Sequence, residues 1–325
     1  MIRSHRRLVL AGGAVALALS LTAPASAQDK YPSRPIELVV PTPPGGGTDT
    51  TFRQLAELVG PILGQKIVVV NRPGGGGMLG TAAVVNARPD GYTIGGLWNA
   101  PLTMTPHLQQ APYKSTDYVA ISLADTAPTT LCVKKDFPAK DAKEFFAHLK
   151  SNPGKVTYGN DGVGGTIQLT LERIFLKEGV KMRPVPFGGA GETLQNYLGG
   201  HVDVFGGSIT TILPYVKDGS SRCLFVTGTE RVASMPDVPS LTDLGMPGEA
   251  TLLWHGVIGP KNLPPDRFAA LEKAFIQAAK SDTFRQFMES RGIKVDGTTG
   301  AEFRKLIDDE FAAMGAVMKS IGLVK

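Results

Sequence analysis

Two glycine-rich segments near the start of the chain have the composition of anion-binding loops. They are residues 43–49, which read PPGGGTD, and residues 74–77, which read GGGG, and each follows a predicted strand and opens onto a helical stretch. Backbone without side chains can approach a ligand closely, and the unpaired N–H groups of a helix's first turn, with the positive end of the dipole, favour an anion. Two such segments side by side predict a carboxylate or phosphate site.

Two further loops of this kind occur later in the chain, at residues 158–166 (YGNDGVGGT) and 186–191 (PFGGAG). A single glycine-rich turn usually reflects only backbone geometry, such as a positive φ angle or tight packing. All four loops, however, lie at the C-terminal ends of predicted strands, and ligands bind at that edge of open α/β sheets. We therefore expect the four loops to line one binding site.

The glycine patterns do not fit a nucleotide site. Residues 75–80 satisfy the letters G-x-G-x-x-G, but residues 71–73 separate the glycine run from the strand, and no acidic residue follows about 20 positions on, where a ribose partner is expected. The segment 43–49 lacks the lysine that a P-loop requires. We expect no nucleotide and no other cofactor.

Catalytic machinery is hard to assemble from the remaining residues. No G-x-S-x-G motif occurs, and beyond residue 27 the histidines are His107, His148, His201 and His255. An enzyme needs a nucleophile or base that a partner orients, and the sequence shows no such set. We predict no catalytic residues and no metal site, although His255 could line a cleft.

Short β-branched runs alternate with helical patterns, which is typical of a parallel α/β sheet. The predicted strands are 36–40, 67–70, 92–97, 119–123, 131–134, 156–159, 182–185, 202–205, 224–226 and 253–258. The predicted helices are 52–62, 79–87, 142–150, 166–178, 191–198 and 209–217, followed by amphipathic stretches at 268–278 and 303–321. Residues 98–118 show little periodicity, so we expect irregular structure there.

The last two helical stretches have no strand of their own beyond 253–258, so we expect them to pack back on the first part of the chain. The predicted fold is α/β with two lobes, each a mostly parallel sheet flanked by helices. Lobe 1 comprises residues 28–124 plus 250–325, and lobe 2 comprises residues 125–249. The chain then crosses between lobes twice, which makes a hinge and a cleft that can close.

Residues 1–27 are typical of a secretory signal peptide, since three arginines precede an apolar stretch and the segment ends in an A-x-A sequence. An uncleaved anchor is disfavoured because the apolar stretch is shorter than the roughly 20 residues of a membrane span. The other lysines and arginines are scattered among acidic residues rather than gathered in a stripe. We expect an exported protein that binds no nucleic acid.

Cys132 and Cys223 are the only cysteines, and both lie in apolar predicted strands. An exported compartment permits a disulfide bond between them. A domain of this size does not need one, so the sequence favours two buried free thiols and leaves the disulfide as the alternative.

Several motifs resemble those of one known family. In chain order, the matching segments are PTPPGGGTD at 41–49, VVNRPGGGG at 69–77, PDGYT at 89–93, VPFGGAGETL at 185–194, VDV at 202–204 and PDVPSL at 236–241. Together they resemble the Bug-type receptors, the periplasmic solute-binding proteins of tripartite tricarboxylate transporters. The resemblance spans essentially the whole chain after residue 27.

This resemblance implies the two-lobed periplasmic binding protein fold, with two crossover hinge strands and with lobes that close on a carboxylic acid held by backbone N–H groups, hydroxyls and waters. Carried onto this sequence, it places in the site Pro44, Gly45, Gly46, Gly47, Thr48, Asp49, Gly77, Gly162, Gly164, Thr166, Gly188, Gly189, Ala190 and Ser208. Trp98 and Asn99 are added because they depart from the commoner family pattern, as does Thr42. We expect Asp49 to orient a loop or a water, since two carboxylates repel each other.

No arginine or lysine lies in the four loops, so uncharged donors would hold each carboxylate, which favours dicarboxylates and aromatic carboxylates over a tricarboxylate. The expected function is that of a monomeric, periplasmic, non-enzymatic receptor that passes its ligand to the permease subunits of a tripartite membrane transporter. Two alternatives stay open. One is a secreted hydrolase or transferase, which requires His255 within hydrogen-bond reach of a Ser, Thr or Asp in the cleft; the other is a sensor subunit that binds the same ligand.

Overall fold

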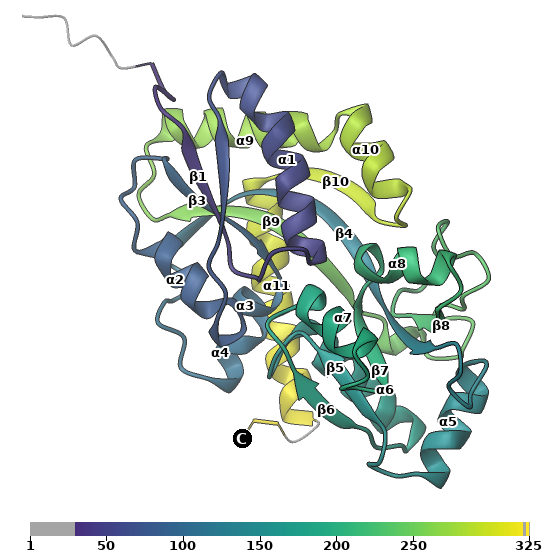
Figure 1. Ribbon diagram of the computed structural model, residues 1–325. Helices are drawn as coiled ribbons and strands as arrows, with labels where there is room; N and C mark the ends of the chain where they lie inside the picture. The colour runs from purple at the N-terminus through teal and green to yellow at the C-terminus, as the bar shows by residue number, and fades with distance from the viewer. Residues whose placement is uncertain (1–29, 321–322, 325) are drawn as a thin grey trace, which may run out of the picture.

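The structure is a computed structural model that describes residues 30–320 and 323–324 (Figure 1). The predicted signal peptide, residues 1–27, lies outside the described residues. In the described part of the chain, ten strands form one mixed sheet in the order β2-β1-β3-β9-β4-β7-β5-β6, with β8 and β10 paired to β4. The strands are β1 (Ile36–Val40), β2 (Ile67–Asn71), β3 (Thr93–Trp98), β4 (Tyr118–Lys134), β5 (Thr157–Asn160), β6 (Arg183–Pro186), β7 (Val204–Ser208), β8 (Ser221–Val226), β9 (Leu252–Pro260) and β10 (Lys294–Thr299).

Helices cover the sheet, and the α/β fold class is confirmed (Figure 1). They are α1 (Gly47–Leu63), α2 (Met78–Val85), α3 (Ala100–Thr103), α4 (Thr105–Leu108), α5 (Ala142–Ser151), α6 (Thr166–Glu178), α7 (Ala190–Leu198), α8 (Ile209–Lys217), α9 (Pro265–Ala279), α10 (Asp282–Glu289) and α11 (Gly300–Ser320). Short 3-10 turns occur at η1 (Gly75–Gly77) and η2 (Pro247–Glu249).

The long antiparallel strands β4 and β9 join two halves of the sheet. β4 pairs with β9 from Tyr118 to Pro128 and with β7 from Thr129 to Val133. Parallel pairing is confined to β2-β1-β3 in the first half and β7-β5-β6 in the second. Figure 1 shows β4 running from one half into the other, so any motion between the halves must bend this strand and β9.

Separate hydrophobic cores lie in the two halves. In the first half, α1, α9 and α10 pack Phe52, Phe275 and Phe284 against the sheet. In the second half, Phe145 of α5 and Phe175 of α6 do the same. α11 reaches both halves, because its Met318 is buried in a small cluster with Trp98 of β3 and Leu169 of α6.

Some elements differ from the sequence predictions. Residues 119–123 and 131–134, which were expected as two strands, belong to one strand that continues through Pro128, which lies opposite Leu252 at the start of β9. Strand β10 was not predicted, because Gly297 has φ of 57° and the β10–β4 register shifts between Val295 and Thr298, which removes the regular alternation. The irregular segment 98–118 contains the short helices α3 and α4.

Cys132 and Cys223 form a disulfide bond, with Cα atoms 3.9 Å apart. The expectation of two free thiols is therefore wrong. The physical reason is that β8 pairs antiparallel with the end of β4 and places the two cysteines directly opposite each other. The two cysteines are 91 residues apart in the sequence, so no local pattern reveals that they are neighbours in the fold.

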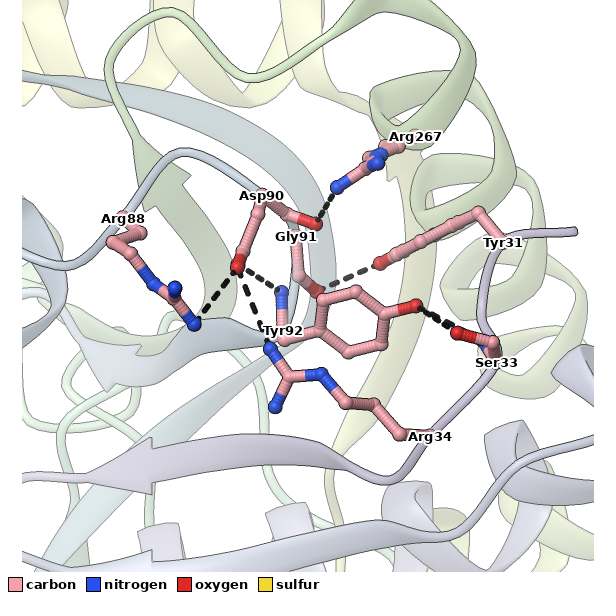
Figure 2. Close-up of polar contacts among 8 residues, drawn as sticks. All are labelled: Tyr31, Ser33, Arg34, Arg88, Asp90, Gly91, Tyr92 and Arg267. Carbon is pink, nitrogen blue, oxygen red and sulfur yellow. Dashed lines mark hydrogen bonds and ion pairs between the residues drawn. The ribbon is translucent and has the colours of Figure 1, made fainter. Parts of the chain in front are cut away.

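The segment that precedes β1 is fastened to the sheet by aromatic and arginine side chains (Figure 2). Tyr31 and Tyr92 meet edge to face with ring centroids 5.3 Å apart. The guanidinium of Arg34 lies 3.9 Å from the centroid of the Tyr92 ring, and Arg267 of α9 donates a hydrogen bond of 2.6 Å to the carbonyl oxygen of Asp90. These contacts hold the start of the described chain against α9 and the turn before β3, at the N-terminal end of β1, whereas residues 43–49 follow the C-terminal end of β1.

Candidate functional site

A cavity of about 30 Å³ lies between the two halves of the sheet. Its lining comes from strand ends and helix starts of both halves: Thr42, Pro43, Gly46, Gly47, Thr48, Trp98, Leu253 and His255 from the first, and Asp161, Ile167, Gly189, Ala190, Gly191 and Ser208 from the second. A space of this size holds roughly one or two water molecules. An organic ligand can enter only if the two halves move apart.

Three helices begin at this cavity. The N-cap residues of α1, α7 and α8 are Gly46, Gly189 and Ser208, and all three line the wall. Within the described residues, none of these three N-caps makes a side-chain hydrogen bond to its helix. The first-turn N–H groups and the positive ends of three helix dipoles therefore converge on one small space, which is an environment that stabilises an anion.

The two halves touch where these helices start. A Cβ atom on Gly46 would lie 3.3 Å from the backbone nitrogen of Gly191, and one on Gly47 would lie 2.5 Å from Ser208 Oγ. Only glycine at position 47 permits this approach without a shift of the chain. Gly46 thus allows backbone to approach backbone across the cavity.

Asp49 holds the first loop in place. Its carboxylate accepts hydrogen bonds from Gly45 N at 2.9 Å, Arg53 Nε at 2.9 Å and Asn71 Nδ2 at 2.8 Å. Burial alone would raise the pKa of Asp49, but the hydrogen bonds from Arg53, Gly45 and Asn71 outweigh it and lower the pKa below its ordinary value. The carboxylate is directed at its own loop, in agreement with the expectation that Asp49 orients the loop.

In the other glycine-rich loops, the chain's own side chains accept hydrogen bonds from the backbone. Gly162 N donates to Asn160 Oδ1 at 3.0 Å, and Gly164 N donates to Gln168 Oε1 at 2.6 Å. Gly188 N donates to Glu192 Oε2 at 2.7 Å. These three N–H groups were predicted to bind the ligand, whereas here they shape the loops that surround the cavity.

Asp161 occupies the N-terminus of α6. Its Oδ1 accepts hydrogen bonds from Ile167 N at 3.1 Å and Gln168 N at 3.3 Å. Its Oδ2 is buried and has no hydrogen-bond partner among the described residues, and the side chain lines the cavity. Burial raises the pKa of Asp161 to about 6, although the backbone N–H groups oppose the shift.

His255 of β9 lies between two side chains at the same wall. Its Nδ1 is 2.8 Å from Asp125 Oδ1 and its Nε2 is 3.1 Å from Thr48 Oγ1. Because an ionised carboxylate only accepts hydrogen bonds, we assign the proton to Nδ1, which leaves Nε2 to accept from the Thr48 hydroxyl. Asp125 and the His255 ring are almost fully buried. The arrangement matches the geometric requirement of the hydrolase alternative.

A second buried network crosses the cavity region. Thr166 Oγ1 donates to Asn99 Oδ1 at 2.5 Å, and Asn99 Nδ2 donates to Glu310 Oε1 at 2.9 Å. Trp254 Nε1 donates to the other oxygen of Glu310. Burial raises the pKa of Glu310, and the hydrogen bonds from Trp254 and Asn99 oppose the shift. This network ties α6, β3, β9 and α11 together.

The structure divides the residues that the sequence placed in the site. Those that line the cavity are Gly46, Gly47, Thr48, Trp98, Gly189, Ala190 and Ser208. Those that lie behind or beside the lining are Pro44, Gly45, Asp49, Gly77, Asn99, Gly162, Gly164, Thr166 and Gly188. Gly77, for example, packs so closely on Trp98 that a Cβ atom would lie 2.6 Å from its ring.

Asp161, Ile167, Gly191 and Leu253 were not among the predicted site residues, and His255 was considered only as a cleft residue. Asp161 and Gly191 lie inside the predicted glycine-rich loops, so the sequence could have indicated them as site residues. Leu253 and His255 carried no comparable signal, because their approach to the loops depends on the antiparallel pairing of β9 with β3 and β4.

The described residues contain no group of three or more His, Cys, Asp or Glu side chains placed to hold a metal ion. Within residues 30–320 and 323–324, none of the helices combines the length and the apolar composition that a membrane span requires.

Comparison with known proteins places the chain in a family. The sequence model of one protein family, described as "Tripartite tricarboxylate transporter family receptor", matches residues 51–323. The chain belongs to this family. It is 35% identical to the "UPF0065 protein in gbd 5'region" of Cupriavidus necator, over 100% of this chain and 99% of that protein. It is 30% identical to BugT of Bordetella pertussis, over 97% of this chain and 98% of that protein. The resemblance to Bug-type receptors is confirmed.

Two solved structures of similar proteins contain carboxylic acids. MatC (Rpa3494) from Rhodopseudomonas palustris with bound malate aligns with a TM-score of 0.83 and 27% identity, covering 88% of this chain and 99% of that one. R. palustris Rpa4515 with adipate aligns with a TM-score of 0.86 and 25% identity, covering 90% and 98%. The family comprises periplasmic solute-binding receptors, and these two similar proteins bind malate and adipate.

Proposed function

We propose that this chain is an exported, non-enzymatic receptor that captures a small organic carboxylate between two lobes and delivers it to the permease subunits of a tripartite membrane transporter. The lobes are residues 28–124 plus 250–325 and residues 125–249. Residues 1–27 direct export to the periplasm, where the protein acts as a monomer. The convergence of the N-termini of α1, α7 and α8 on one cavity carries this proposal.

The ligand's carboxylate is held by backbone N–H groups at the starts of α1 and α7 and by the hydroxyl of Ser208. Charge-assisted hydrogen bonds of this kind contribute about 1.5–3 kcal/mol each. Among the described residues that line the cavity there is no lysine or arginine, so uncharged donors must hold each carboxylate. Dicarboxylates and aromatic carboxylates suit such a wall better than a tricarboxylate, and malate and adipate in the two similar structures support this class.

Binding favours the closed arrangement because the ligand contacts both lobes at once. Strands β4 and β9 act as the hinge, since β4 pairs with strands of both halves and β9 begins at Leu252, opposite Pro128, where β4 crosses from one half to the other. Only a difference in affinity between the open and closed forms can shift their populations, and contacts from both sides exist only in the closed form.

Calorimetric titration with mono-, di- and tricarboxylates tests the proposal, using the wild type and Gly46→Val. The φ angle of Gly46 is −81°, so valine does not strain the backbone there, but its side chain enters the space between Gly46 and Gly191. Gly248→Val is the matched control, because a Cβ atom on Gly248 meets nothing within 4 Å. We expect the wild type and the control to bind a carboxylate with micromolar or tighter affinity, and Gly46→Val to lose binding. No binding of any carboxylate to the wild type would contradict the proposal.

A hydrolase is the second candidate, because His255 lies within hydrogen-bond reach of Thr48 and Asp125. In that function, Thr48 Oγ1 would attack an ester carbonyl carbon, His255 would accept its proton and Asp125 would orient the imidazole. The family of receptors to which the chain belongs favours binding instead. Release of p-nitrophenolate from p-nitrophenyl acetate separates the two: hydrolysis that disappears in both Thr48→Val and His255→Gln supports the enzyme, and equal rates in all three proteins exclude it.

A further inference from the structure

We infer that the carboxylate captured here carries a hydrogen-bond donor, either a hydroxyl or an ammonium group, and that Asp161 is the residue that selects it. This inference rests on the proposed function and narrows its ligand to hydroxy or amino carboxylic acids.

Asp161 lines the cavity, and one of its two carboxylate oxygens has no partner among the described residues. The residue is 5% exposed. Two backbone N–H groups at the start of α6 fix the carboxylate through Oδ1, which leaves Oδ2 as a buried acceptor at the cavity wall. A buried acceptor without a hydrogen bond costs free energy, so this atom gains a partner when a ligand supplies one.

No cation of the protein serves as that partner. In the part of the chain that the structure describes, no lysine, arginine or histidine forms an ion pair with Asp161. Asp49, the other acid in the glycine-rich loops of this wall, differs in this respect, since Arg53 and Asn71 donate to its carboxylate. Asp161 is therefore the acid that is free to interact with a ligand.

The rest of the wall offers donors. Trp98 Nε1 can only donate a hydrogen bond, is buried at the cavity and has no partner among the described residues. The first-turn N–H groups of α1, α7 and α8 are donors as well. The Thr42 hydroxyl, also buried at the cavity without a partner among the described residues, can donate or accept. The wall thus presents donors for the oxygens of a carboxylate, and in Asp161 a carboxylate acceptor for a group that donates, which matches the polar atoms of a hydroxy or amino acid.

A ligand with carboxylates alone would meet Asp161 as a like charge. Two carboxylates in a shared buried site repel each other, which weakens binding unless one is protonated. A ligand hydroxyl or ammonium group removes this repulsion and replaces it with a hydrogen bond. We expect a donor-bearing acid to bind at least about tenfold more tightly than its unsubstituted counterpart, the factor that corresponds to one charge-assisted hydrogen bond.

Matched ligand sets test the inference by calorimetry at pH 7.5. The sets are succinate with malate and aspartate, glutarate with 2-hydroxyglutarate and glutamate, and benzoate with 3-hydroxybenzoate. In the set that binds the wild type, the acid with a donor should bind at least about tenfold more tightly than the acid without one. In Asp161→Ala this ratio should fall to about threefold or less. Asp141→Ala, which removes an exposed carboxylate from the N-cap of α5, should keep the wild-type ratio.

The outcomes separate this inference from the proposed function. If the wild type binds succinate, glutarate or benzoate as tightly as the substituted partner, the inference fails and the receptor function stands. If the preference exists but Asp161→Ala retains it, the assignment to Asp161 fails. If none of these acids binds the wild type, the inference fails, and the receptor function fails as well if no other mono-, di- or tricarboxylate binds. The wild-type comparison needs no variant, so it decides the ligand class even if Asp161→Ala does not fold.

Discussion

Thr166 and Asn99 are joined across the cavity region by a hydrogen bond of 2.5 Å from Thr166 Oγ1 to Asn99 Oδ1. Thr166 begins α6 in the second half of the molecule, and Asn99 follows β3 in the first. Both residues are buried, and Asn99 is held in turn by Glu310 of α11 and the carbonyl of Leu252. Like the close approach of Gly46 to Gly191, this hydrogen bond directly connects the two halves of the molecule beside the cavity.

Replacement of Thr166 by valine should weaken ligand binding, because the closed form loses this bond while the open form loses nothing. A buried hydrogen bond contributes about 0.5–1.5 kcal/mol, so we expect an affinity about 2–10-fold lower. Calorimetry with the tightest-binding carboxylate measures it. Thr170→Val is the control, because the Thr170 hydroxyl bonds only within α6, to Thr166 O. Equal affinities of Thr166→Val and Thr170→Val would show that the bond does not favour closure.

Replacement of Asp125 by alanine should destabilise the protein strongly. It leaves the almost fully buried His255 without the partner of its Nδ1 proton. A buried donor that is left without its acceptor costs about 1–3 kcal/mol. Urea denaturation measures the free energy of unfolding. Asp282→Ala breaks the ion pair with Arg285, in which the Asp282 side chain is 85% exposed, and should cost less than about 1 kcal/mol. A similar small cost for Asp125→Ala would mean that His255 does not depend on this carboxylate.

The stability of the protein should depend on pH through Asp161. Its pKa is about 6 in the folded protein and ordinarily 3.8, so between these values the folded protein binds a proton that the unfolded chain has lost. The contribution of Asp161 to the free energy of unfolding is fully present below pH 3.8 and is lost as the pH rises through about 6. The free energy of unfolding of Asp161→Asn, relative to the wild type, should therefore rise by up to about 3 kcal/mol between pH 4 and pH 7.

Urea denaturation of both proteins at several pH values measures this difference. The raised pKa values of Glu310 and Asp296 also contribute to the pH dependence, but they are common to the wild type and the variant and cancel in the comparison. Asp141→Asn, at the exposed N-cap of α5, controls for the loss of a charge. A difference between Asp161→Asn and the wild type that does not change with pH would contradict the burial of an ionised Asp161.

The disulfide between Cys132 and Cys223 closes a long loop of the chain, since 91 residues separate the two positions. The variant with serine at both positions should unfold with a free energy lower by about 2–4 kcal/mol. Dithiothreitol should lower the stability of the wild type to a similar degree and leave the double variant unchanged. A thiol assay on the denatured, unreduced wild type should find no free thiol; two thiols per chain would contradict the bond.

Local patterns were sufficient for most of the elements that position the site. Strand β1 and helices α6 and α8 have the predicted bounds, because their apolar spacing and flanking glycines are local features. The β-α-β-α-β unit that places α1 after residues 43–46 was predicted for the same reason. The start of α1 at Gly47 was not marked by apolar spacing, which begins at Phe52.

Contacts between distant residues could not be predicted in this way. His255 meets Asp125 and Thr48 across separations of 130 and 207 residues, and only the pairing of β9 with β4 brings them together. Asp161 appears in the sequence as one polar residue of a glycine-rich loop. Its burial and its place in the cavity wall depend on the packing of α6 against the second half of the sheet.

A crystal structure of the protein with its tightest-binding carboxylate tests the central claim most directly. We predict that the ligand lies in the cavity and that its carboxylate oxygens accept hydrogen bonds from backbone N–H groups at the starts of both α1 and α7. A carboxylate bound instead to the arginine cluster of Figure 2, which comprises Arg34, Arg88 and Arg267, or a ligand in the cavity that contacts only one of the two helices, would contradict the account.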